Sequence, residues 1–382
     1  MSSNKQATED AALSLWKYSD ALGSVPEEYE GLPDEERVER TERAVQELGD
    51  DTVILGHNYQ RSSVTRFADF LGDSLQLSRQ AANADADHVV FCGVTFMAET
   101  ADIVTDTEQK VILPSMEASC PMAGMAENIQ VDDAWNELTE VVDGEEVTPV
   151  TYVNSYASLK AFTAEHGGSC CTSSNASRVF DWALDRGDKI FFTPDKHLAH
   201  NTLHELGYGD DDFVVWNPWE PELGGNTEDE IKDASFILWE GFCQVHERFS
   251  AEDVEQVREQ HPDVNVIVHP ECRREVVEEA DVAGSTSTII EKVKNAPEGS
   301  KWSIGTEIHL VKRLARENPE KEVFGLCGEE CMDCNAMRQI DPDFLLYALE
   351  ELGNGNVVNQ IEVDPDDKKK ARDAIERMLS IS

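Results

Sequence analysis

Short apolar runs alternate with helical stretches along most of this chain of 382 residues, and this alternation limits the folds it can adopt. After about residue 33 the runs are "TVILGH", "HVVFCGV", "KVILP", "TPVTYVN", "KIFFTP", "DFVVWN", "VNVIVHP", "KWSIG" and "EVFGL". Between them lie helix patterns such as "SRVFDWALDRG", closed by glycine, and "AEDVEQVREQHP", closed by proline. Strands that alternate with helices form parallel sheets, so the sequence predicts an α/β fold.

A weak internal repeat divides this pattern into three modules. In each module a polar residue ends a strand and a hydroxyl follows 17 or 19 positions later; the pairs are His57 and Ser74, Asn154 and Ser173, and His269 and Thr286. A cysteine follows each pair, in turn Cys120, Cys243 and Cys334. Parallel sheets bind ligands at the carboxyl ends of their strands. The repeat therefore predicts three similar αβα domains with parallel sheets, arranged around a pseudo-threefold axis and one shared site.

The expected domain limits follow from these modules. We expect an acidic helical extension over 1–40, αβα domains over 41–119, 120–242 and 243–334, and a C-terminal helical segment over 335–382. We hypothesise that the last 45 residues return to pack on the first domain. The chain has no apolar run of the roughly 18 to 20 residues that a membrane span needs, and its start does not have the pattern of a secretion signal. We therefore expect a cytoplasmic protein without a membrane partner.

Acidic residues outnumber basic ones by a wide margin. The chain has 32 lysines and arginines against 77 aspartates and glutamates, a net charge of -45. A nucleic-acid-binding protein would carry the opposite sign, so we expect no nucleic-acid partner. The acidic residues recur throughout the chain, which favours a halophilic protein from a high-salt cytoplasm, where salt screens their repulsion.

The nine cysteines are expected to be thiols, metal ligands or redox groups, because disulfide frameworks are rare in cytoplasmic proteins. Cys92 lies in an apolar run and is interpreted as a buried thiol. Cys170 and Cys171 are adjacent and should point to opposite faces of a strand, so they are not expected to bind one metal together. Cys272 is expected to be inert and packed.

The remaining cysteines allow several kinds of metal site. Cys243 and His246 form a Cys-x-x-His pair, which would suit zinc on one helix face, although His246 fits equally well as a hydrogen-bonded core residue. The stretch "CGEECMDCNAM" holds Cys327, Cys331 and Cys334. It could be part of a zinc ribbon or an iron–sulfur loop with a fourth ligand elsewhere. Alternatively one cysteine is a ligand and the other two are free or form a redox pair, and local spacing does not separate these options.

At this point the chain resembles the quinolinate synthases, iron–sulfur enzymes of NAD biosynthesis, from about residue 40 to 340. The matching segments are "ILGHNYQ", "DFLGDSLQLSR", "VVFCGVTFMAETADIV", "VILPSMEASCPMA", "VTYVNSYASLKA", "CTSSNA", "EGFCQVHERFS", "VIVHPEC", "AGSTSTII", "IGTEIHLVKRLARENPEK" and "CNAM". In that family three cysteines, one per domain, hold a [4Fe–4S] cluster and leave the fourth iron open. By position the resemblance implies Cys120, Cys243 and Cys334, with Cys327 and Cys331 as spare thiols or a redox pair. The family's common spacing is C-x2-C-x2-C, whereas here the first gap is three residues.

The resemblance also implies the reaction and its residues. The family condenses iminosuccinate with dihydroxyacetone phosphate to quinolinate, with loss of phosphate and water, and a separate enzyme supplies the iminosuccinate. Substrate binding is then expected from His57, Ser74, Tyr152, Val153, Asn154, Ser173, His269, Pro270, Glu271 and Thr286. Glu271 is our choice for the base that enolises the triose phosphate, with His269 polarising its carbonyl. Tyr59 and Tyr152 are expected to move protons or to close over the substrate.

Three alternatives stay open from the residues alone. The hydroxyls of Ser74, Ser173 and Thr286 would lie near helix starts, which suits anion binding but suits helix capping at least as well. A zinc-dependent lyase or hydrolase would use Cys243, His246 and the C-terminal thiols. A non-enzymatic iron–sulfur redox sensor would use the C-terminal cysteines and would not need Cys120 or Cys243.

Overall fold

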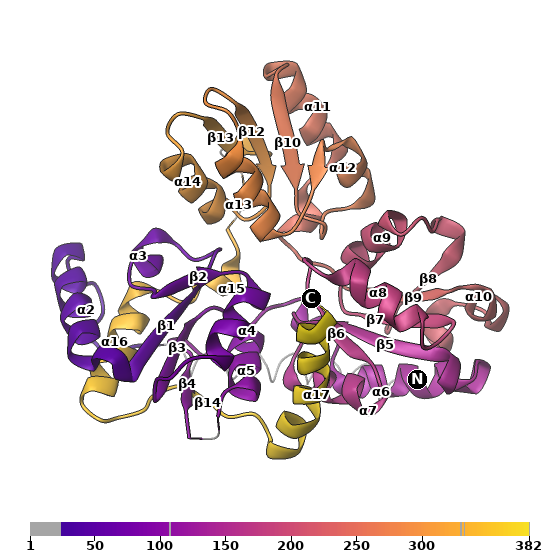
Figure 1. The fold of residues 1–382 in the computed structure, drawn as a ribbon, viewed down its shortest axis with the longest axis horizontal. Coiled ribbons are helices and arrows are strands. Elements are labelled where there is room, and N and C mark those ends of the chain that lie inside the picture. Colours follow the sequence, from indigo (N-terminus) through magenta and orange to yellow (C-terminus); the bar gives the residue numbers. More distant parts are fainter. Residues whose placement is uncertain (1–23, 107, 329–330, 332, 382) are drawn as a thin grey trace, which may run out of the picture.

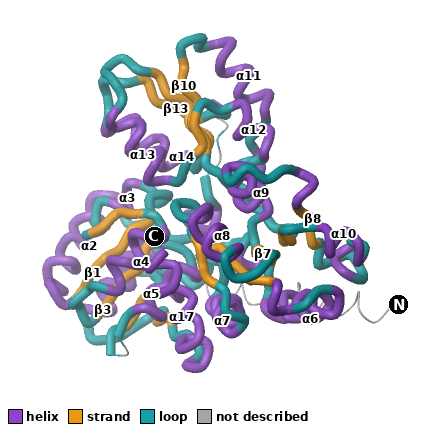
Figure 2. Tube along the Cα trace, turned by 45° about the vertical axis from the view of Figure 1, so that its right-hand side comes forward, coloured by secondary structure: helices purple, strands orange, loops and turns teal. Residues whose placement is uncertain are grey.

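A computed structural model describes residues 24–381 of the protein, except residues 107, 329, 330 and 332. Its strands form three separate sheets, each covered by helices. Figure 1 and Figure 2 show the three lobes around a common centre. This arrangement confirms the predicted fold of three αβα domains with parallel sheets around a pseudo-threefold axis. No helix in the part of the chain described is long and apolar enough to cross a membrane.

The first sheet has the strand order β14-β4-β3-β1-β2, and its neighbours are parallel except for the antiparallel pair β14–β4. Its strands are β1 (Thr52–His57), β2 (Phe70–Gly72), β3 (His88–Cys92), β4 (Lys110–Ile112) and β14 (Gln360–Ile361). The helices of this lobe are α2 (Asp34–Leu48), α3 (Ser62–Thr65), α4 (Ser74–Ala82), α5 (Thr95–Val104) and α16 (Pro342–Gly353).

The second sheet is all parallel, with the order β6-β5-β7-β9-β8. Its strands are β5 (Val147–Tyr152), β6 (Ser169–Cys171), β7 (Lys189–Thr193), β8 (Phe213–Trp216) and β9 (Phe236–Trp239). The helices are α6 (Asn128–Val141), α7 (Ala157–Glu165), α8 (Ala176–Leu184), α9 (Lys196–Glu205) and α10 (Glu228–Asp233).

The third sheet is also parallel, with the order β11-β10-β12-β13. Its strands are β10 (Val264–Val268), β11 (Val282–Ala283), β12 (Lys301–Gly305) and β13 (Glu322–Gly325). The helices are α11 (Ala251–Gln260), α12 (Arg274–Glu279), α13 (Thr286–Asn295) and α14 (Ile308–Glu317), and α15 (Asn335–Arg338) follows β13.

Four strands of every sheet share one spatial order. Numbered along the chain within each module, the order is 2-1-3-4, as in β2-β1-β3-β4, β6-β5-β7-β9 and β11-β10-β12-β13. The strands β8 and β14 are additions at sheet edges. A cysteine of the predicted set follows the fourth strand in each module. The predicted polar residues His57, Asn154 and His269 lie at the end of the first strand or within two residues after it. The weak repeat in the sequence is therefore a repeat of structure.

All nine apolar runs contain a strand, and most of their residues are buried. Every residue of β5, β7 and β9 is buried, as expected for parallel strands covered on both faces. Five strands were not among the predicted apolar runs: β2, β6, β9, β11 and β14. Four of these five strands contain only two or three residues, which is too short for a hydrophobic period to be recognised.

The two ends of the described chain pack on the first two lobes. Residues 1–23 of the predicted acidic extension lie outside the described residues, and α2 begins at Asp34 after a series of turns. Helix α2 packs on α16, and Arg40 Nε donates to Glu350 Oε1 at 2.9 Å. The segment 335–382 also contains the short strand β14. The domain limits themselves stay a prediction.

The last helix, α17 (Pro365–Ile381), joins the first lobe to the second. It packs against α7 and β6 of the second lobe and against α5 of the first. Lys368 Nζ lies 2.9 Å from Asp102 Oδ1 on α5, while Arg377 donates to the carbonyl of Gly168 before β6. Residues 342–361 thus return to the first lobe, as hypothesised, but the final helix is shared with the second.

Gly168, just before β6, provides a test of how closely this segment approaches β5. A Cβ added at Gly168 would lie 1.9 Å from the carbonyl oxygen of Pro149 on β5. The substitution Gly168→Ala should therefore force β6 away from β5 and lower the free energy of unfolding by about 1–3 kcal/mol. Gly353→Ala is the matched control, because no atom lies within 4 Å of its added Cβ. Urea unfolding in high salt measures both; equal stability of the two variants would contradict the close approach.

Candidate active site

A pocket is lined by side chains from all three lobes. The predicted site residues in its lining are His57, Tyr59, Ser74, Cys120, Tyr152, Asn154, Ser173, Cys243, His269, Glu271, Thr286 and Cys334. Val153 and Pro270 lie outside that lining: the Val153 N–H donates to the carbonyl of Cys171, and the Pro270 carbonyl accepts from Asn201. The threefold arrangement brings together residues that lie up to 277 positions apart, as the range from His57 to Cys334 shows.

His57 and His269 occupy equivalent positions at the ends of β1 and β10. In each case the backbone N–H two residues later donates to Nδ1, from Tyr59 at 3.2 Å and from Glu271 at 3.3 Å. Burial lowers the pKa of both imidazoles to about 3. Both rings are therefore neutral, and because Nδ1 accepts a hydrogen bond, Nε2 carries the proton and can act as a donor.

The predicted hydroxyls lie beside helix caps but do not form them. Asp73 caps α4 and Ser285 caps α13, so Ser74 and Thr286 are the first helical residues. Ser173 lies in the turn before α8, two residues before its N-cap residue. The capping interpretation of these three hydroxyls is therefore wrong, and they are available at helix N-termini, where backbone dipoles favour anions.

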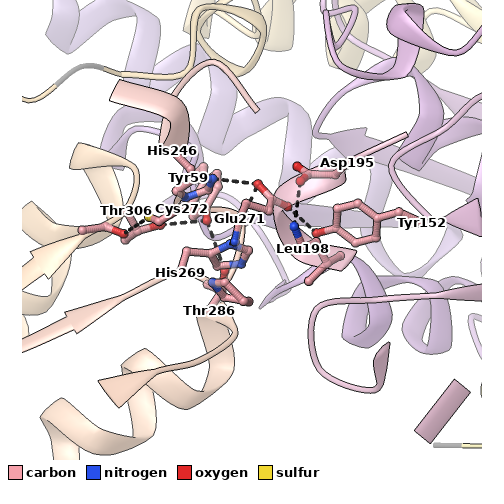
Figure 3. A network of polar contacts seen from close by, with 12 residues as sticks. Tyr59, Tyr152, Asp195, Leu198, His246, His269, Glu271, Cys272, Thr286 and Thr306 are labelled. Carbon is pink, nitrogen blue, oxygen red and sulfur yellow. Dashed lines mark hydrogen bonds and ion pairs between the residues drawn. The ribbon is translucent and has the colours of Figure 1, made fainter. Parts of the chain in front are cut away.

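A buried carboxylate, Glu271, organises the polar network of the pocket (Figure 3). The Tyr152 hydroxyl donates to Oε1 at 2.6 Å, and His246 Nδ1 lies 2.7 Å from Oε2. His246 Nε2 contacts the Thr306 hydroxyl at 3.1 Å, and Thr306 in turn contacts the Tyr59 hydroxyl at 2.9 Å. The network thus runs from the first lobe through the third to the second.

The partners of Glu271 determine its charge. Burial alone would raise the pKa of this carboxyl, but His269, His246 and the hydrogen bond from the Tyr152 hydroxyl outweigh burial and lower it. Asp195, a second buried carboxyl at the start of α9, shows the opposite shift: burial and the charge of Glu271 raise its pKa well above the usual range. Glu271 is therefore ionised, whereas the pKa of the nearby Asp195 carboxyl is shifted in the opposite direction.

Cys120, Cys243 and Cys334 line this pocket and also a second hollow on their other side. The carbonyl of each cysteine accepts an N–H from the residue four positions later, so each one opens a helical turn. Backbone N–H groups three positions later, those of Ala123, His246 and Met337, point at the three sulfurs. The three cysteine positions are therefore structurally equivalent.

Burial raises the pKa of all three thiols, to about 11 for Cys120 and about 12 for Cys334, and well above the usual range for Cys243. Without a cation the thiols are therefore neutral. Three converging sulfurs with N–H donors fit an iron–sulfur cluster, because bound iron would displace the thiol protons and the N–H groups would stabilise the resulting thiolates.

The other cysteines lie apart from these three. Cys92 and Cys272 are fully buried thiols, as their sequence contexts predicted, and Cys170 and Cys171 on β6 are fully buried as well. Cys327 and Cys331 are joined by a disulfide, which selects the paired option for these two residues. Among the described residues of 327–337, Cys334 is therefore the one cysteine that lines the pocket.

Cys243 and His246 do not lie on one face of a regular helix, so the structure does not support the zinc interpretation of this pair. Cys243 lies in a loop, and His246 begins a single 3-10 turn, His246–Arg248. Cys243, His246 and Glu271 do have ligand atoms within 4.8 Å of one another. Both ring nitrogens of His246 are nevertheless engaged, by Glu271 and by Thr306, so it is the hydrogen-bonded core histidine of the two interpretations.

Several residues of the site carried no recognisable signal in the sequence. In the sequence, Asp195 has the pattern of an ordinary helix cap, and Thr306 that of a hydroxyl residue after a strand. Glu307 accepts the N–H of Cys334 at 3.4 Å and also caps α14, a motif typical of any helix start. Lys160, within the apolar stretch "ASLKAF", is an exception, because a lysine at that position is itself unusual.

The comparisons with known proteins agree with this geometry. A model of the family described as quinolinate synthetase A protein matches residues 39–380. This chain belongs to the quinolinate synthase family. A quinolinate synthase of Haloarcula marismortui is 60% identical over 375 residues, which cover 98% of this chain and 99% of the relative. One of Halobacterium salinarum is 59% identical and covers 97% and 98%, and one of Corynebacterium glutamicum is 49% identical and covers 94% and 90%. The first two organisms are halophiles, which agrees with the interpretation of the acidic composition.

In this member of the quinolinate synthase family, Lys160 holds the loop that follows β5. Its ammonium group is fully buried, donates to the carbonyl of Ser155 just after Asn154, and lies 5.7 Å from the centre of the Phe96 ring. Burial lowers its pKa to about 8, although the charges of Cys170 and Glu99 oppose this shift.

The substitution Lys160→Met should reveal this pKa through the pH dependence of stability. As the pH rises from 8 to about 10.5, the folded state releases the Lys160 proton before the unfolded state does, so the wild type gains stability. The stability difference between wild type and variant should therefore shift in favour of the wild type across that window. Urea unfolding at pH 7 to 10 measures it, with the exposed Lys369→Met as control. A difference that stays constant with pH would contradict the buried charge.

Proposed function

We propose that this protein is a quinolinate synthase that condenses iminosuccinate with dihydroxyacetone phosphate to quinolinate, with loss of phosphate and water, in de novo NAD biosynthesis. The observation that carries the proposal is the meeting of three equivalent cysteines with the Glu271 network in one pocket. Membership of the family over residues 39–380 supports the same conclusion.

Cys120, Cys243 and Cys334 would hold a [4Fe–4S] cluster in this proposal. Their equivalence and the N–H groups that face their sulfurs fit such a group. When bound, the cluster would supply an iron with one non-cysteine position, which acts as a Lewis acid toward a carboxylate or hydroxyl of the substrate. The three cysteines must lose their thiol protons when the cluster binds. Because burial raises their pKa values, this deprotonation depends on the binding of iron.

The remaining lining suits two anionic substrates. His57 and His269 present neutral Nε2–H donors, and Ser74, Ser173 and Thr286 add hydroxyls at helix starts. The carboxamide oxygen of Asn154 is buried without a hydrogen-bond partner among the described residues, and it faces this pocket. We propose that the substrate carboxylates and the phosphate bind the imidazole and hydroxyl donors, and that the Asn154 oxygen accepts an N–H or O–H of the substrate. Val153 and Pro270 would hold the loops through their backbone bonds.

Glu271 would act as the base that enolises the triose phosphate. It is ionised and can therefore accept a proton, and the Tyr152 hydroxyl and the His246 ring hold its two oxygens in place. His269 lies beside it, with its Nδ1 3.8 Å from Oε2, and would polarise the substrate carbonyl through Nε2–H. Burial raises the pKa of Tyr59 and Tyr152 well above the usual range, so both keep their protons and would pass them through hydrogen bonds.

Metal analysis tests this proposal first. Protein purified without oxygen in high salt should contain about four irons and four acid-labile sulfides per chain, and it should form quinolinate from the two substrates. Zinc without sulfide would favour the zinc-dependent lyase or hydrolase instead. A cluster without quinolinate formation would favour the redox sensor. The enzyme that supplies iminosuccinate stays a proposed partner.

Cys334→Ala and Cys327→Ala should have opposite effects on the cluster. Loss of Cys334 removes a proposed ligand, so reconstituted protein should lose its iron and sulfide and the visible absorption of the cluster. Loss of Cys327 opens the disulfide with Cys331 but should leave the cluster in place. If the two variants retain equal amounts of cluster, the assignment of one cysteine per domain is wrong.

Tyr152→Phe should lower kcat about 10- to 100-fold, because the Glu271 carboxylate loses a hydrogen bond from a buried donor. The ring remains packed, so stability and iron content should stay close to those of the wild type. Tyr156→Phe is the matched control, since its hydroxyl contacts Ser119 at 2.7 Å and it is not in the pocket lining. Steady-state kinetics at saturating substrate compare the two; an unchanged kcat for Tyr152→Phe would exclude this role.

A further inference from the structure

Two histidines and an aspartate form a cluster on the second lobe, in the C-terminal half of α9. His200 and His204 lie four positions apart and therefore on one face of the helix. Asp210 begins the 3-10 turn Asp210–Asp212, which leads directly into β8. The Nε2 atoms of the two histidines lie 2.8 Å and 3.0 Å from the same oxygen, Asp210 Oδ1.

The spacing of these atoms suits a metal ion. One ligand atom from each of the three residues lies within 4.8 Å of the other two. Donors at about 2.0–2.1 Å from a tetrahedral ion are separated by roughly 3.3 Å, so an expansion of a few tenths of an ångström would admit one. Both imidazoles belong to adjacent turns of a regular helix, which limits how far they must reorganise.

The chemistry of the donors indicates the class of ion. Imidazole nitrogens with one carboxylate favour zinc and its transition-metal neighbours over calcium or magnesium, which prefer oxygen ligands. The two imidazoles are about one-fifth exposed and the Asp210 carboxylate is 76% exposed, so water can reach the cluster and complete the coordination. Burial lowers the pKa of His200, and neutral imidazole is the form that binds metal. The positive charge of Arg274 nearby opposes a cation, while Asp211 and Asp212 in the same turn favour it.

We propose that His200, His204 and Asp210 bind one divalent transition-metal ion, such as Zn²⁺, at a site separate from the three pocket cysteines. The ion would connect α9 to the turn before β8, an edge strand that has no counterpart in the third sheet. This inference does not depend on the proposed activity.

The position of α9 gives the site a structural consequence. One turn before His204, the side-chain amide of Asn201 donates to the carbonyls of Pro270 and Cys272, both at 2.8 Å. These two residues flank Glu271 in the chain. An ion bound by His200 and His204 would therefore stiffen the helix that holds the Glu271 loop.

Zinc titration of the cluster-loaded, full-length protein tests the proposal. The protein is first treated with a chelating resin in high salt, and Zn²⁺ binding is followed by anaerobic calorimetry. The wild type should bind one Zn²⁺ per chain, and His204→Gln should weaken this binding about tenfold or more. His261→Gln is the matched control: His261 is also half-buried and has a carboxylate, Glu322, at 3.8 Å.

Two further readouts separate this site from the cysteines. Zinc X-ray absorption should show nitrogen or oxygen neighbours at about 2.0–2.1 Å and no sulfur at about 2.3 Å. Zn²⁺ should raise Tm by about 2 °C or more in the wild type and in His261→Gln, but not in His204→Gln. Equal binding by the wild type and His204→Gln, a sulfur shell in the spectrum, or no binding at all would each overturn the proposal.

Discussion

The burial of Glu271 is the interaction on which the arrangement of the three lobes depends. A buried, ionised carboxylate is costly unless donors surround it. Its donors come from different parts of the chain: Tyr152 ends β5 of the second sheet, and His246 lies in the segment that links the second sheet to the third. Through Thr306 the same network reaches Tyr59 after β1. The charge is therefore stabilised by donors from the second lobe and from the segment that leads to the third, and the network extends to the first lobe through Thr306 and Tyr59.

The threefold repeat provides a common framework that the three modules use differently. Each module delivers a strand end, a helix start and a cysteine to the centre, because all three sheets share the strand order 2-1-3-4. The first and third modules each end their first strand in a neutral histidine, whereas the second contributes Tyr152 and Asn154. Glu271, the proposed base, belongs to the third module alone, and Asp195 beside it belongs to the second. The repeat places equivalent backbone positions around the pocket, and the chemistry of the pocket depends on which side chain each module has at those positions.

Much of the fold was predictable because parallel strands are buried on both faces and therefore appear as continuous apolar runs. The prediction failed for strands such as β11 (Val282–Ala283), whose pairing depends on β10 and not on any pattern of its own. In the site, strand ends such as His57 and His269 could be aligned by spacing alone. The capping interpretation of Ser74 and Thr286 was wrong because the residue just before each one, Asp73 or Ser285, is an equally good cap.

The sequence by itself determined the α/β class, the threefold repeat, the acidic surface and the three cysteines that follow the fourth strands, because each of these depends on local composition or spacing. Only the tertiary structure decided that Cys327 pairs with Cys331, that His246 is held by Glu271 and Thr306, and that α17 bridges two lobes. It also decided the opposite pKa shifts of Glu271 and Asp195, which carry the same functional group. Those properties depend on which distant residues surround a side chain and on how little water reaches it, and neither is encoded in the neighbouring sequence.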